Sequence, residues 1–517
     1  MSIERDFVLR ALLGHNFLPI QKKAREELPP VFSSVTFSPD IARMLVAGKP
    51  RKAEGFQGYD SVEYKLTRFN GVSRSCSIPH PVAYAHAALC VHENWDELSY
   101  IANNKTSMIR PREHSDGRII IMDYEKSFER SRRILTKSFG CRFMVHTDIS
   151  NCFPSIYSHA ISWAAVGFDH AKKHKPPKHK DEWFNQLDEK VRALKRGETQ
   201  GVAIGPATSN IVSEAILARI DESLRDDFVY TRFIDDYTAY CETEAGAQEF
   251  VRRLSEELAK YKLLLNIRKT EIVPLPEGLG TDWVAEIALA LPKGESASAF
   301  DAMNYLNFAV EMSKRTPDGS VLKYALKGLL RKQLNLLAQI DVLRYALNLS
   351  FHQPVLLPVL DRLFDATVLP GEFRFGSELQ RLLFENAQYR RSDGMTWSLF
   401  YLNKFNVKIG DECAAEVLAS RDCMALLMLY LSGDAHYQAM VVDFASGVDS
   451  SDLYELDQYW ILCYQLFLDG NGASPYPTED AFEVLRDGGV SFTESPGISV
   501  DKLREDNEAR LFEELSA

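Results

Sequence analysis

Two adjacent aspartates lie in the middle of a stretch that otherwise has the composition of a β-strand. The segment RFIDDY, residues 232–237, is flanked by β-branched and aromatic residues on both sides, whereas aspartate is among the residues least favoured in strands. One interpretation is a hairpin turn, because aspartate tolerates turn geometry and bonds the nearby backbone. However, tight hairpins favour glycine at the second turn position, and two neighbouring carboxylates repel each other unless a cation lies beside them. This segment alone leaves both a turn and a cation site open.

The length and the charge distribution predict two domains of different character. A chain of 517 residues exceeds what a single hydrophobic core usually supports. Residues 291–517 carry 20 Lys and Arg against 33 Asp and Glu, whereas residues 1–290 carry 40 against 39. The net charge of −12 therefore comes from the second half, and the first half can present a basic face to a polyanion. We expect the domain boundary near residue 290.

The periodicity of the sequence changes at the same place. Residues 1–290 mix β-rich runs with amphipathic helical patterns, which is typical of an α+β domain. Residues 291–517 contain repeated helical patterns separated by Gly, Pro, Asp or Ser. These patterns predict an all-α domain, either a compact bundle or helix pairs stacked in a HEAT-like shape. We expect its acidic end, which includes FEELSA at 512–517, either to remain solvated or to contact a basic face of a neighbouring subunit.

Several features predict a cytoplasmic protein. The eight cysteines are scattered without a C-x-x-C pair, which argues against a zinc site and against a disulfide framework. No uninterrupted apolar stretch approaches the length of a membrane span. The first residues mix acids and bases with apolar residues and lack the pattern of a signal peptide. We therefore expect a reducing environment and no membrane partner.

A further carboxylate lies at the end of another β-type run. The segment RFMVHTDIS, residues 142–150, contains Asp148, and two strand ends that bring Asp148 beside Asp235 would build a site for two Mg²⁺ ions. Mn²⁺ would fit the same oxygen ligands. The main-chain carbonyl of Ile149 is an additional candidate ligand. Two such ions stabilise the attacking and leaving oxygens of a phosphoryl transfer.

A glycine-containing loop lies between the two acidic segments. Residues 199–221 begin with Gln200-Gly201 and Gly205-Pro206, and an amphipathic helical pattern follows. Glycine permits close approach of the backbone to a ligand, and helix N-termini attract phosphates. An ordinary loop and helix cap would use the same residues, but the position between two carboxylate segments favours nucleotide binding.

The order of these motifs resembles the palm of reverse transcriptases. It begins with Asp148, with Phe153 five residues later, and continues through Q-G-x-x-x-G-P-x-x-S and F-I-D-D to LLLNIRKTEI at 263–272. The resemblance covers roughly residues 70–275. It implies a fingers and palm domain at 1–290 and, for the whole chain, an α+β fold.

The resemblance also implies roles for individual residues. Asp148, Asp235 and Asp236 would form the catalytic, metal-binding group. Lys269 would donate a proton to the pyrophosphate leaving group, unless it only caps a helix end, and Phe153 would exclude the 2′-hydroxyl and select dNTPs, unless it is a core aromatic. The other expected substrate contacts are Gln200, Gly201, Gly205 and Pro206 under the nucleotide, and the finger candidates Arg130, Arg132 and Arg133 on the triphosphate.

Further details resemble one subgroup, the bacterial abortive-infection reverse transcriptases of the AbiK group and of P2-type prophages. These details are the segment 74–95, Thr199 before the Gln-Gly pair, and the long helical second half. The resemblance implies phage defence, untemplated DNA synthesis from dNTPs, homo-oligomers, and a domain 291–517 that replaces the thumb. The alternatives are a template-copying, RNA-directed DNA polymerase, which would bind RNA, and a non-catalytic scaffold that recognises a phage component.

Protein priming follows from the same resemblance. The residues after Lys269 lack a convincing primer-grip turn, so a tyrosine hydroxyl could replace the 3′-end of a primer; a hydroxyl near a divalent ion loses its proton more easily. The candidates are Tyr59 and Tyr64 in the polar, flexible-looking stretch 55–69. An ordinary half-buried tyrosine is the alternative for both.

A basic segment lies between the first acidic motif and the Gln-Gly loop. Residues 171–183 contain five lysines around a Pro-Pro pair, a composition that predicts an exposed loop. The segment would be either a solvated loop or a contact to a polynucleotide backbone, and it lacks the interleaved aromatics that would indicate base stacking.

Overall fold

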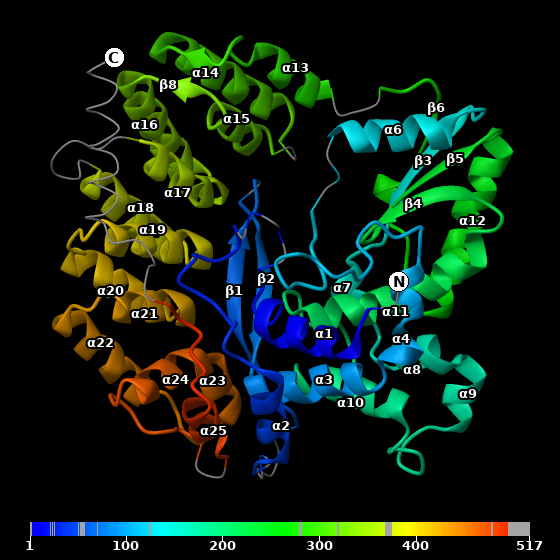
Figure 1. The fold of residues 1–517 in the computed structure, drawn as a ribbon, viewed down its shortest axis with the longest axis horizontal. Coiled ribbons are helices and arrows are strands. Elements are labelled where there is room, and N and C mark those ends of the chain that lie inside the picture. The colour runs from blue at the N-terminus through cyan, green and yellow to red at the C-terminus, as the bar shows by residue number, and fades with distance from the viewer. Residues whose placement is uncertain are drawn as a thin grey trace.

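The computed structural model describes most of the chain between residues 3 and 494. The N-terminal half lies at the centre and right of Figure 1, and the helical C-terminal half lies at the left and top. The acidic end FEELSA lies outside the described residues. The positions that the description leaves out are 1–2, 21, 23, 25, 50, 52–56, 70, 124, 126, 279–281, 318–319, 368–374, 477–478 and 495–517.

A four-stranded antiparallel sheet forms the palm of the N-terminal half (Figure 1). Its strand order is β4-β5-β3-β6, and its strands are rich in the β-branched and aromatic residues that favour a pleated, half-buried surface. Helix α12 packs against β3 and β5, and α6 also packs against β5. The bounds are α6 Ser127–Ser138, β3 Phe143–Asp148, β4 Val229–Phe233, β5 Asp236–Cys241, α12 Glu244–Lys260 and β6 Glu271–Pro274.

A two-stranded antiparallel hairpin, β1 Ser61–Thr67 and β2 Ser73–Pro79, stands near the centre of Figure 1, between the helices of the C-terminal half and the palm. It leads into α3, whose apolar residues are buried all round, as expected for a central helix. The other helices of this half are α1 Arg5–Arg10, a π-helical turn Ala11–His15, α2 Pro39–Ala47, α3 Pro81–Glu93, α4 Trp95–Leu98, α5 Tyr100–Asn103, α7 Cys152–Ser155, α8 His159–Val166, α9 Phe168–Lys173, α10 Trp183–Ala193, α11 Ala207–Leu224 and a 3₁₀ turn Ile267–Lys269.

The C-terminal half is a succession of helices with one short parallel pair, β7 Ser296–Ala297 and β8 Gln333–Leu334. The expected α+β class is confirmed, and the predicted switch to helices is present. The helices are α13 Asp282–Ala290, α14 Ala299–Arg315, α15 Val321–Leu329, α16 Leu336–His352, α17 Leu357–Ala366, α18 Gly376–Gln388, α19 Ser392–Lys404, α20 Asp411–Ser420, α21 Cys423–Tyr430, α22 Ala435–Ser446, α23 Leu453–Gln458, α24 Trp460–Leu468 and α25 Ala481–Asp487, with a 3₁₀ turn Pro354–Leu356.

The expected boundary near residue 290 stays a prediction, and so does the HEAT-like arrangement. Helix α13, which lies just before that boundary, packs against α14 and α15, which follow it. None of the helices in the described part of the chain is long and apolar enough to cross a membrane.

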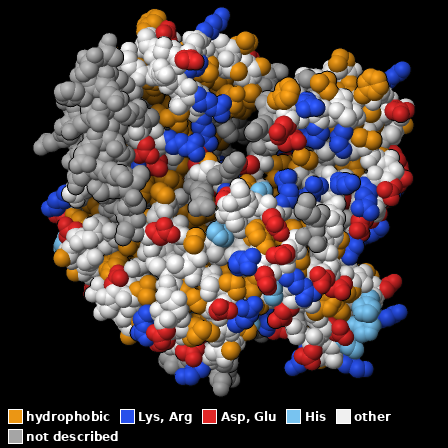
Figure 2. Space-filling view, viewed as in Figure 1, with side chains coloured by type: hydrophobic (Ala, Val, Ile, Leu, Met, Phe, Trp, Pro, Cys, Tyr) orange, Lys and Arg blue, Asp and Glu red, His pale blue; other side chains and the backbone are white. Residues whose placement is uncertain are grey.

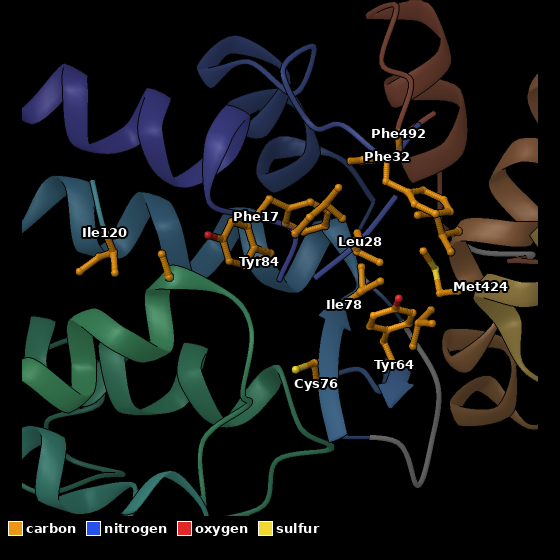
Figure 3. Packing of buried hydrophobic residues seen from close by; sticks show 14 of the residues in the cluster. Phe17, Leu28, Phe32, Tyr64, Cys76, Ile78, Tyr84, Ile120, Met424 and Phe492 are labelled. Atoms are coloured by element: carbon orange, nitrogen blue, oxygen red, sulfur yellow. The ribbon is translucent and has the colours of Figure 1, made fainter. Parts of the chain in front are cut away.

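The two halves share one hydrophobic core, and the hairpin lies at the centre of this contact. Tyr64 and Ile78 of the hairpin lie near Met424 of α21 and Phe492 near the end of the described chain (Figure 3). Polar contacts cross the same boundary. Arg51 is paired with Asp457 and with Glu479 at 2.7 and 2.6 Å, and all three side chains are buried. The helical half therefore supports the hairpin directly.

Candidate active site

The sheet register brings the carboxylates of the two acidic motifs together. Asp148 ends β3 and lies opposite Asp236, which begins β5. The backbone N–H of Ile149 donates a hydrogen bond to the carbonyl of Asp235 (N···O 3.2 Å), which joins the end of β3 to the β4–β5 turn. The expected neighbourhood of Asp148 and the Asp235-Asp236 pair is therefore present.

The turn that carries Asp235 has an unusual backbone. Ile234 adopts a φ angle of 58°, in the left-handed region that a β-branched residue rarely occupies. Arg232 at the end of β4 is fully buried and pairs with Glu214 (2.7 Å) and Asp221 (2.8 Å) of α11. Its guanidinium also donates to the carbonyl of Ile234 (2.8 Å). This network fixes the backbone conformation that presents Asp235.

Burial and repulsion by neighbouring carboxylates disfavour the ionised form of Asp235 and of Asp236. Asp148 is 6% exposed, and its Oδ1 atom is buried without a hydrogen-bond partner. Burial raises the pKa of Asp235, and the negative charge of Asp148 raises it further. Burial, followed by the charges of Asp235 and Asp148, raises the pKa of Asp236 to about 6. The cluster would therefore be stabilised by added positive charge.

A lysine supplies part of this charge. The Nζ atom of Lys269 lies 2.6 Å from Oδ2 of Asp148, and the hydrogen bond between them is the main cause of a raised pKa of Lys269. The lysine side chain is 66% exposed. Its position beside Asp148 is compatible with the predicted role as proton donor, and that role stays a prediction.

The carboxylates also fit a divalent cation. Among the residues that the structure describes, no three His, Cys, Asp or Glu side chains are already arranged as a metal site. The unpartnered oxygen of Asp148 and the raised pKa values of Asp235 and Asp236 nevertheless match a hard cation that binds oxygen ligands. The carbonyl of Ile149, the other predicted ligand, follows Asp148 directly in the chain.

The Gln-Gly loop packs on the turn that contains Phe153. Val202 donates its N–H to the carbonyl of Phe153 (3.0 Å), and Nε2 of Gln200 donates to the carbonyl of Pro154 (3.1 Å). Gly201 has a φ angle of 80°, and a Cβ atom there would lie 3.1 Å from the Pro154 carbonyl oxygen. The structure thus brings the two predicted nucleotide-binding segments together, with Phe153 half-buried between solvent and core.

The second glycine of this loop permits a close approach to the hairpin. Gly205 has a φ angle of 132°, and a Cβ atom there would lie 2.9 Å from the carbonyl oxygen of Ser77 in β2. The N–H of Ser77 donates to the carbonyl of Ile204 (2.7 Å). Pro206 is the N-cap residue of α11. Chain packing therefore accounts for Gly205 and Pro206, and their contact with a nucleotide stays a prediction.

Two arginines that the sequence analysis missed have charges that act on Asp235. Arg68 and Arg74 flank the tip of the β1–β2 hairpin, and both side chains are exposed. Burial raises the pKa of Asp235, whereas the charge of Arg74 lowers it. Burial and the charge of Arg74 lower the pKa of Arg68, whereas the charge of Asp235 raises it. The sequence signal that could have identified them is the pair of arginines around the turn RFNGVSR at 68–74.

The predicted finger arginines Arg130, Arg132 and Arg133 lie on one helix, and their contact with the triphosphate stays a prediction. They belong to α6, which packs against β5 of the palm. The Arg133 guanidinium is bound to Glu125 and donates to Thr231 Oγ1 (2.9 Å). An amphipathic helix distributes its side chains by its local periodicity, so the sequence could not show which part of the molecule it contacts.

Helix α6 instead lines a cavity over one face of the palm sheet. The cavity has a volume of ≈ 640 Å³ and is bordered by Arg130 and Arg133, by His146 of β3 and by Thr238 of β5. In the sheet register His146 lies opposite Thr238, two residues before Asp148 and two residues after Asp236. Because side chains alternate along a strand, this cavity lies on the sheet face of Asp148 and Asp236.

Tyr59 and Tyr64 are buried, so the expectation of a flexible, exposed segment for both tyrosines is wrong. The Tyr59 hydroxyl donates to Glu479 (3.1 Å), and the Tyr64 hydroxyl bonds Thr396 Oγ1 (2.9 Å). Figure 3 shows Tyr64 in the shared core near Met424. Burial is the first cause of a raised pKa for both hydroxyls, which disfavours the alkoxide that priming requires. The sequence could not show this burial, because it results from the tertiary packing of the helical half against the hairpin.

The basic segment borders a second cavity near the active site. Lys172 of α9 lies over the rings of Trp163 (5.3 Å) and Phe168 (5.4 Å). It lines a cavity of ≈ 590 Å³ together with Ser150 and Gln200. This cavity therefore extends from the turn after Asp148 to the basic segment, and both interpretations of the segment, solvated loop and polynucleotide contact, stay predictions.

Comparison with known proteins places a recognised domain over this site. Residues 96–306 match the family model described as Reverse transcriptase (RNA-dependent DNA polymerase). The match contains both acidic motifs, the Gln-Gly loop and Lys269. The chain therefore carries a reverse-transcriptase domain. No curated protein matches the sequence.

Three solved structures with similarity to this chain are yeast telomerases. The apo telomerase of Candida tropicalis truncated from its C-terminal domain is 13% identical, with 46% of this chain and 55% of that chain covered and a TM-score of 0.30. The apo telomerase of Candida tropicalis is 12% identical (87% of this chain and 78% of that chain covered, TM-score 0.32). The telomerase of Candida albicans in complex with a fragment of telomeric RNA is 11% identical (79% and 68% covered, TM-score 0.30). This chain thus spans about half the length of the first of these structures.

Proposed function

We propose that this chain is a DNA polymerase of the reverse-transcriptase type that transfers nucleotides from dNTPs. The observation that carries the proposal is the cluster of a buried Asp148, a partly buried Asp235 and an exposed Asp236 inside the matched reverse-transcriptase domain. Buried like charges are costly unless a function or a partner compensates for them. A scaffold without catalysis would gain nothing from this cluster, which favours the enzyme over the scaffold alternative.

The chemistry assigns a task to each residue. An attacking hydroxyl oxygen forms a bond to the α-phosphorus of the dNTP, the bond from that phosphorus to the pyrophosphate oxygen breaks, and pyrophosphate leaves. The three aspartates would hold Mg²⁺ or Mn²⁺, which when bound supplies the positive charge that stabilises both oxygens. Lys269, beside Asp148, would give a proton to the leaving pyrophosphate. The carbonyl of Ile149 would complete the oxygen ligands.

The surroundings of the carboxylates supply sites for the substrates. The charges of Arg68 and Arg74, on an exposed hairpin tip, act on Asp235 or respond to it, and these two arginines would bind the triphosphate. Phe153, at the contact with the Gln-Gly loop, would exclude a 2′-hydroxyl. The cavity between α6 and the sheet, with Arg130 and Arg133, would hold the growing DNA strand on the face that carries the aspartates. Figure 2 shows Lys and Arg around a hollow between the upper helices and the palm, which suits a polyanionic product.

We infer a role in phage defence by untemplated synthesis, as in the abortive-infection enzymes of the AbiK and P2 groups. The support is the motif pattern at 74–95, the long helical half, and the absence from the sequence of a convincing primer grip. Protein priming belongs to the same inference, but it would need a hydroxyl other than those of Tyr59 and Tyr64, or an opening of the core that covers them. The template-copying polymerase remains the alternative. A cytoplasmic homo-oligomer is part of the proposal, and light scattering that finds a monomer at micromolar concentration would contradict the oligomer.

The test is incorporation of a labelled dNTP by the purified chain with Mg²⁺ and without template. We expect labelled polymer from the wild type and none from Asp235→Asn, which keeps the side-chain volume but lacks the charge. Label that remains on the protein after boiling in detergent would support protein priming. Label that forms only after an RNA template is added would favour the template-copying alternative. Incorporation by Asp235→Asn at the wild-type rate would refute the proposed catalytic role.

A defence assay separates the enzyme from the scaffold. Cells that carry the wild-type chain should survive or abort phage infection, and cells with Asp235→Asn should behave as if the chain were absent. Full protection by the charge-neutral variant would mean that catalysis is not the function and that recognition of a phage component is.

A further inference from the structure

The tip of the β1–β2 hairpin is held by a carboxylate from the helical half of the chain. Asp393, in the first turn of α19, accepts a hydrogen bond from the backbone N–H of Thr67 at Oδ2 (2.7 Å) and from the Thr67 hydroxyl at Oδ1 (2.8 Å). Oδ1 also accepts the N–H of Gly394 (2.8 Å). Asp393 is 5% exposed and Thr67 is 4% exposed. Three donors therefore satisfy a buried carboxylate whose partner lies 326 residues earlier in the chain.

Thr67 is the last residue of β1, and Arg68 follows it directly. The turn beyond is tight, because Arg68 donates its N–H to the carbonyl of Val72 (3.1 Å) and its carbonyl accepts the N–H of Gly71 (2.9 Å). Arg74 lies opposite Leu66 in the register, so both arginines stand within one residue of the Thr67 pair. Any displacement of Thr67 is therefore transmitted to Arg68 and Arg74, the two arginines of the hairpin tip.

We propose that Asp393 is a positioning residue for nucleotide binding, which fixes Thr67 and thereby holds Arg68 and Arg74 at the triphosphate. The helical half would thus set the geometry of the nucleotide site without touching the nucleotide. This inference rests on the proposed polymerase function and on the assigned role of the two arginines.

The geometry favours a local role over general support of the interface. A second contact between α19 and the same strand joins Thr396 Oγ1 to the Tyr64 hydroxyl (2.9 Å). Tyr64 lies three residues before Thr67 and points into the shared core (Figure 3). It supports the base of the hairpin, whereas Asp393 binds backbone and side chain at the residue next to Arg68. Both contacts join α19 to β1, but only the contact of Asp393 with Thr67 is adjacent to the arginines. The contact of Thr396 with Tyr64 therefore serves as a control.

The test measures the KM for dNTP and kcat of full-length variants. Asp393→Ala should raise the KM about tenfold, with kcat changed less than threefold, because the triphosphate contact is misplaced and the aspartates are untouched. Asp393→Asn, which keeps one oxygen for the Thr67 N–H, should recover most of this loss. Tyr64→Phe removes the other contact and should leave the KM within twofold of the wild type. An equal rise of the KM in Tyr64→Phe would overturn the proposal in favour of general support.

A double-mutant cycle shows whether Asp393 acts through the arginines. In a chain that already carries Arg68→Ala and Arg74→Ala, the further change Asp393→Ala should leave the KM unchanged, since nothing remains to be positioned. The same tenfold rise in that background, or no rise in the wild-type background, would refute the inference. Should Asp393→Ala fail to fold, Thr67→Val replaces it in both backgrounds of the double-mutant cycle. Loss of the hydroxyl contact alone should raise the KM about threefold in the wild-type background and leave it unchanged in the background without the two arginines.

Failure of this inference is distinguishable from failure of the proposed function. If the wild type incorporates dNTPs and Asp235→Asn does not, the polymerase assignment stands, whatever the result for Asp393. If the wild type incorporates no dNTP under any condition tested, the polymerase assignment fails and the inference fails with it.

Discussion

Replacing Asp235 by Asn should abolish catalysis and at the same time stabilise the fold in the absence of metal. Asp235 lies beside Asp148 and precedes Asp236, and after burial, repulsion from neighbouring carboxylates contributes to the raised pKa values of Asp235 and Asp236. An amide of the same size removes one of the three charges without creating a cavity. The active site is thus expected to trade stability for function.

The size of the effect follows from the pKa of Asp236, which rises from 3.8 to about 6. One pKa unit corresponds to ~1.4 kcal/mol. For a fully buried carboxyl group, this shift would therefore lower the free energy of unfolding by about 3 kcal/mol. The side chain of Asp236 is exposed, and solvent screening reduces this value to about 1 kcal/mol. Burial is the larger cause of the shift, so loss of the Asp235 charge should recover only part of this free energy. For a chain of 517 residues the melting temperature should therefore rise by up to about 1 °C.

The pH dependence has a definite sign. A carboxyl group whose pKa is higher in the folded state binds more protons there, so its contribution to stability falls as the pH rises. For Asp236 this penalty is absent below pH 3.8, grows between pH 3.8 and about 6, and is complete above about pH 6. The melting temperature of Asp235→Asn should therefore exceed that of the wild type by more at pH 7.5 than at pH 4.5.

Thermal unfolding monitored by intrinsic fluorescence, with EDTA and with Mg²⁺, tests both points. A free Mg²⁺ concentration ten times the dissociation constant should stabilise the wild type by about 1.4 kcal/mol, whereas Asp235→Asn should respond far less. The control is Asp181→Asn, which removes an exposed carboxylate from the basic segment. This variant should leave the melting temperature unchanged both in EDTA and in Mg²⁺. The reasoning about this carboxylate cluster is wrong if Asp235→Asn melts at a lower temperature than the wild type in EDTA. It is also wrong if Mg²⁺ stabilises this variant as much as it stabilises the wild type.

Three further variants test neighbouring residues. Phe153→Ala should admit NTPs while dNTP incorporation stays near the wild-type rate, because the ring acts by exclusion; a folded variant that still rejects NTPs in a competition assay would identify Phe153 as a core residue. Lys269→Gln should lower kcat about tenfold to a hundredfold with little change in the KM, since proton donation acts in the transition state, and an unchanged single-turnover rate would exclude it as the proton donor. Arg232→Met should remove the cation that the buried carboxylates of Glu214 and Asp221 share, leaving Asp221 only neutral donors, and destabilise the fold by about 3–5 kcal/mol, so an unaltered melting curve would show that this ion-pair network is dispensable.

The sequence determined the local features of the site. The β-type runs that end at Asp148 and lead to Asp235 could be predicted because strand propensity and alternation are properties of a few consecutive residues. Gly201 and Gly205 were predicted as points of close approach to a ligand; the structure shows them close to Pro154 and Ser77 of the chain, and contact with a nucleotide stays a prediction. The order of the acidic segments and the loop predicted the reverse-transcriptase domain that the family match supports over residues 96–306, and the change of periodicity predicted the helical second half.

The tertiary structure decided which side chains surround this site. Arg68 and Arg74 approach Asp235, while α6 and its arginines lie against the palm sheet, and no local pattern distinguishes these two basic segments. Tyr64 is buried because a helix more than 300 residues later in the sequence covers it, and Asp393 reaches Thr67 from the same helix. Such contacts depend on how complete elements pack together, and the periodicity of one segment contains no information about the partner that it will meet.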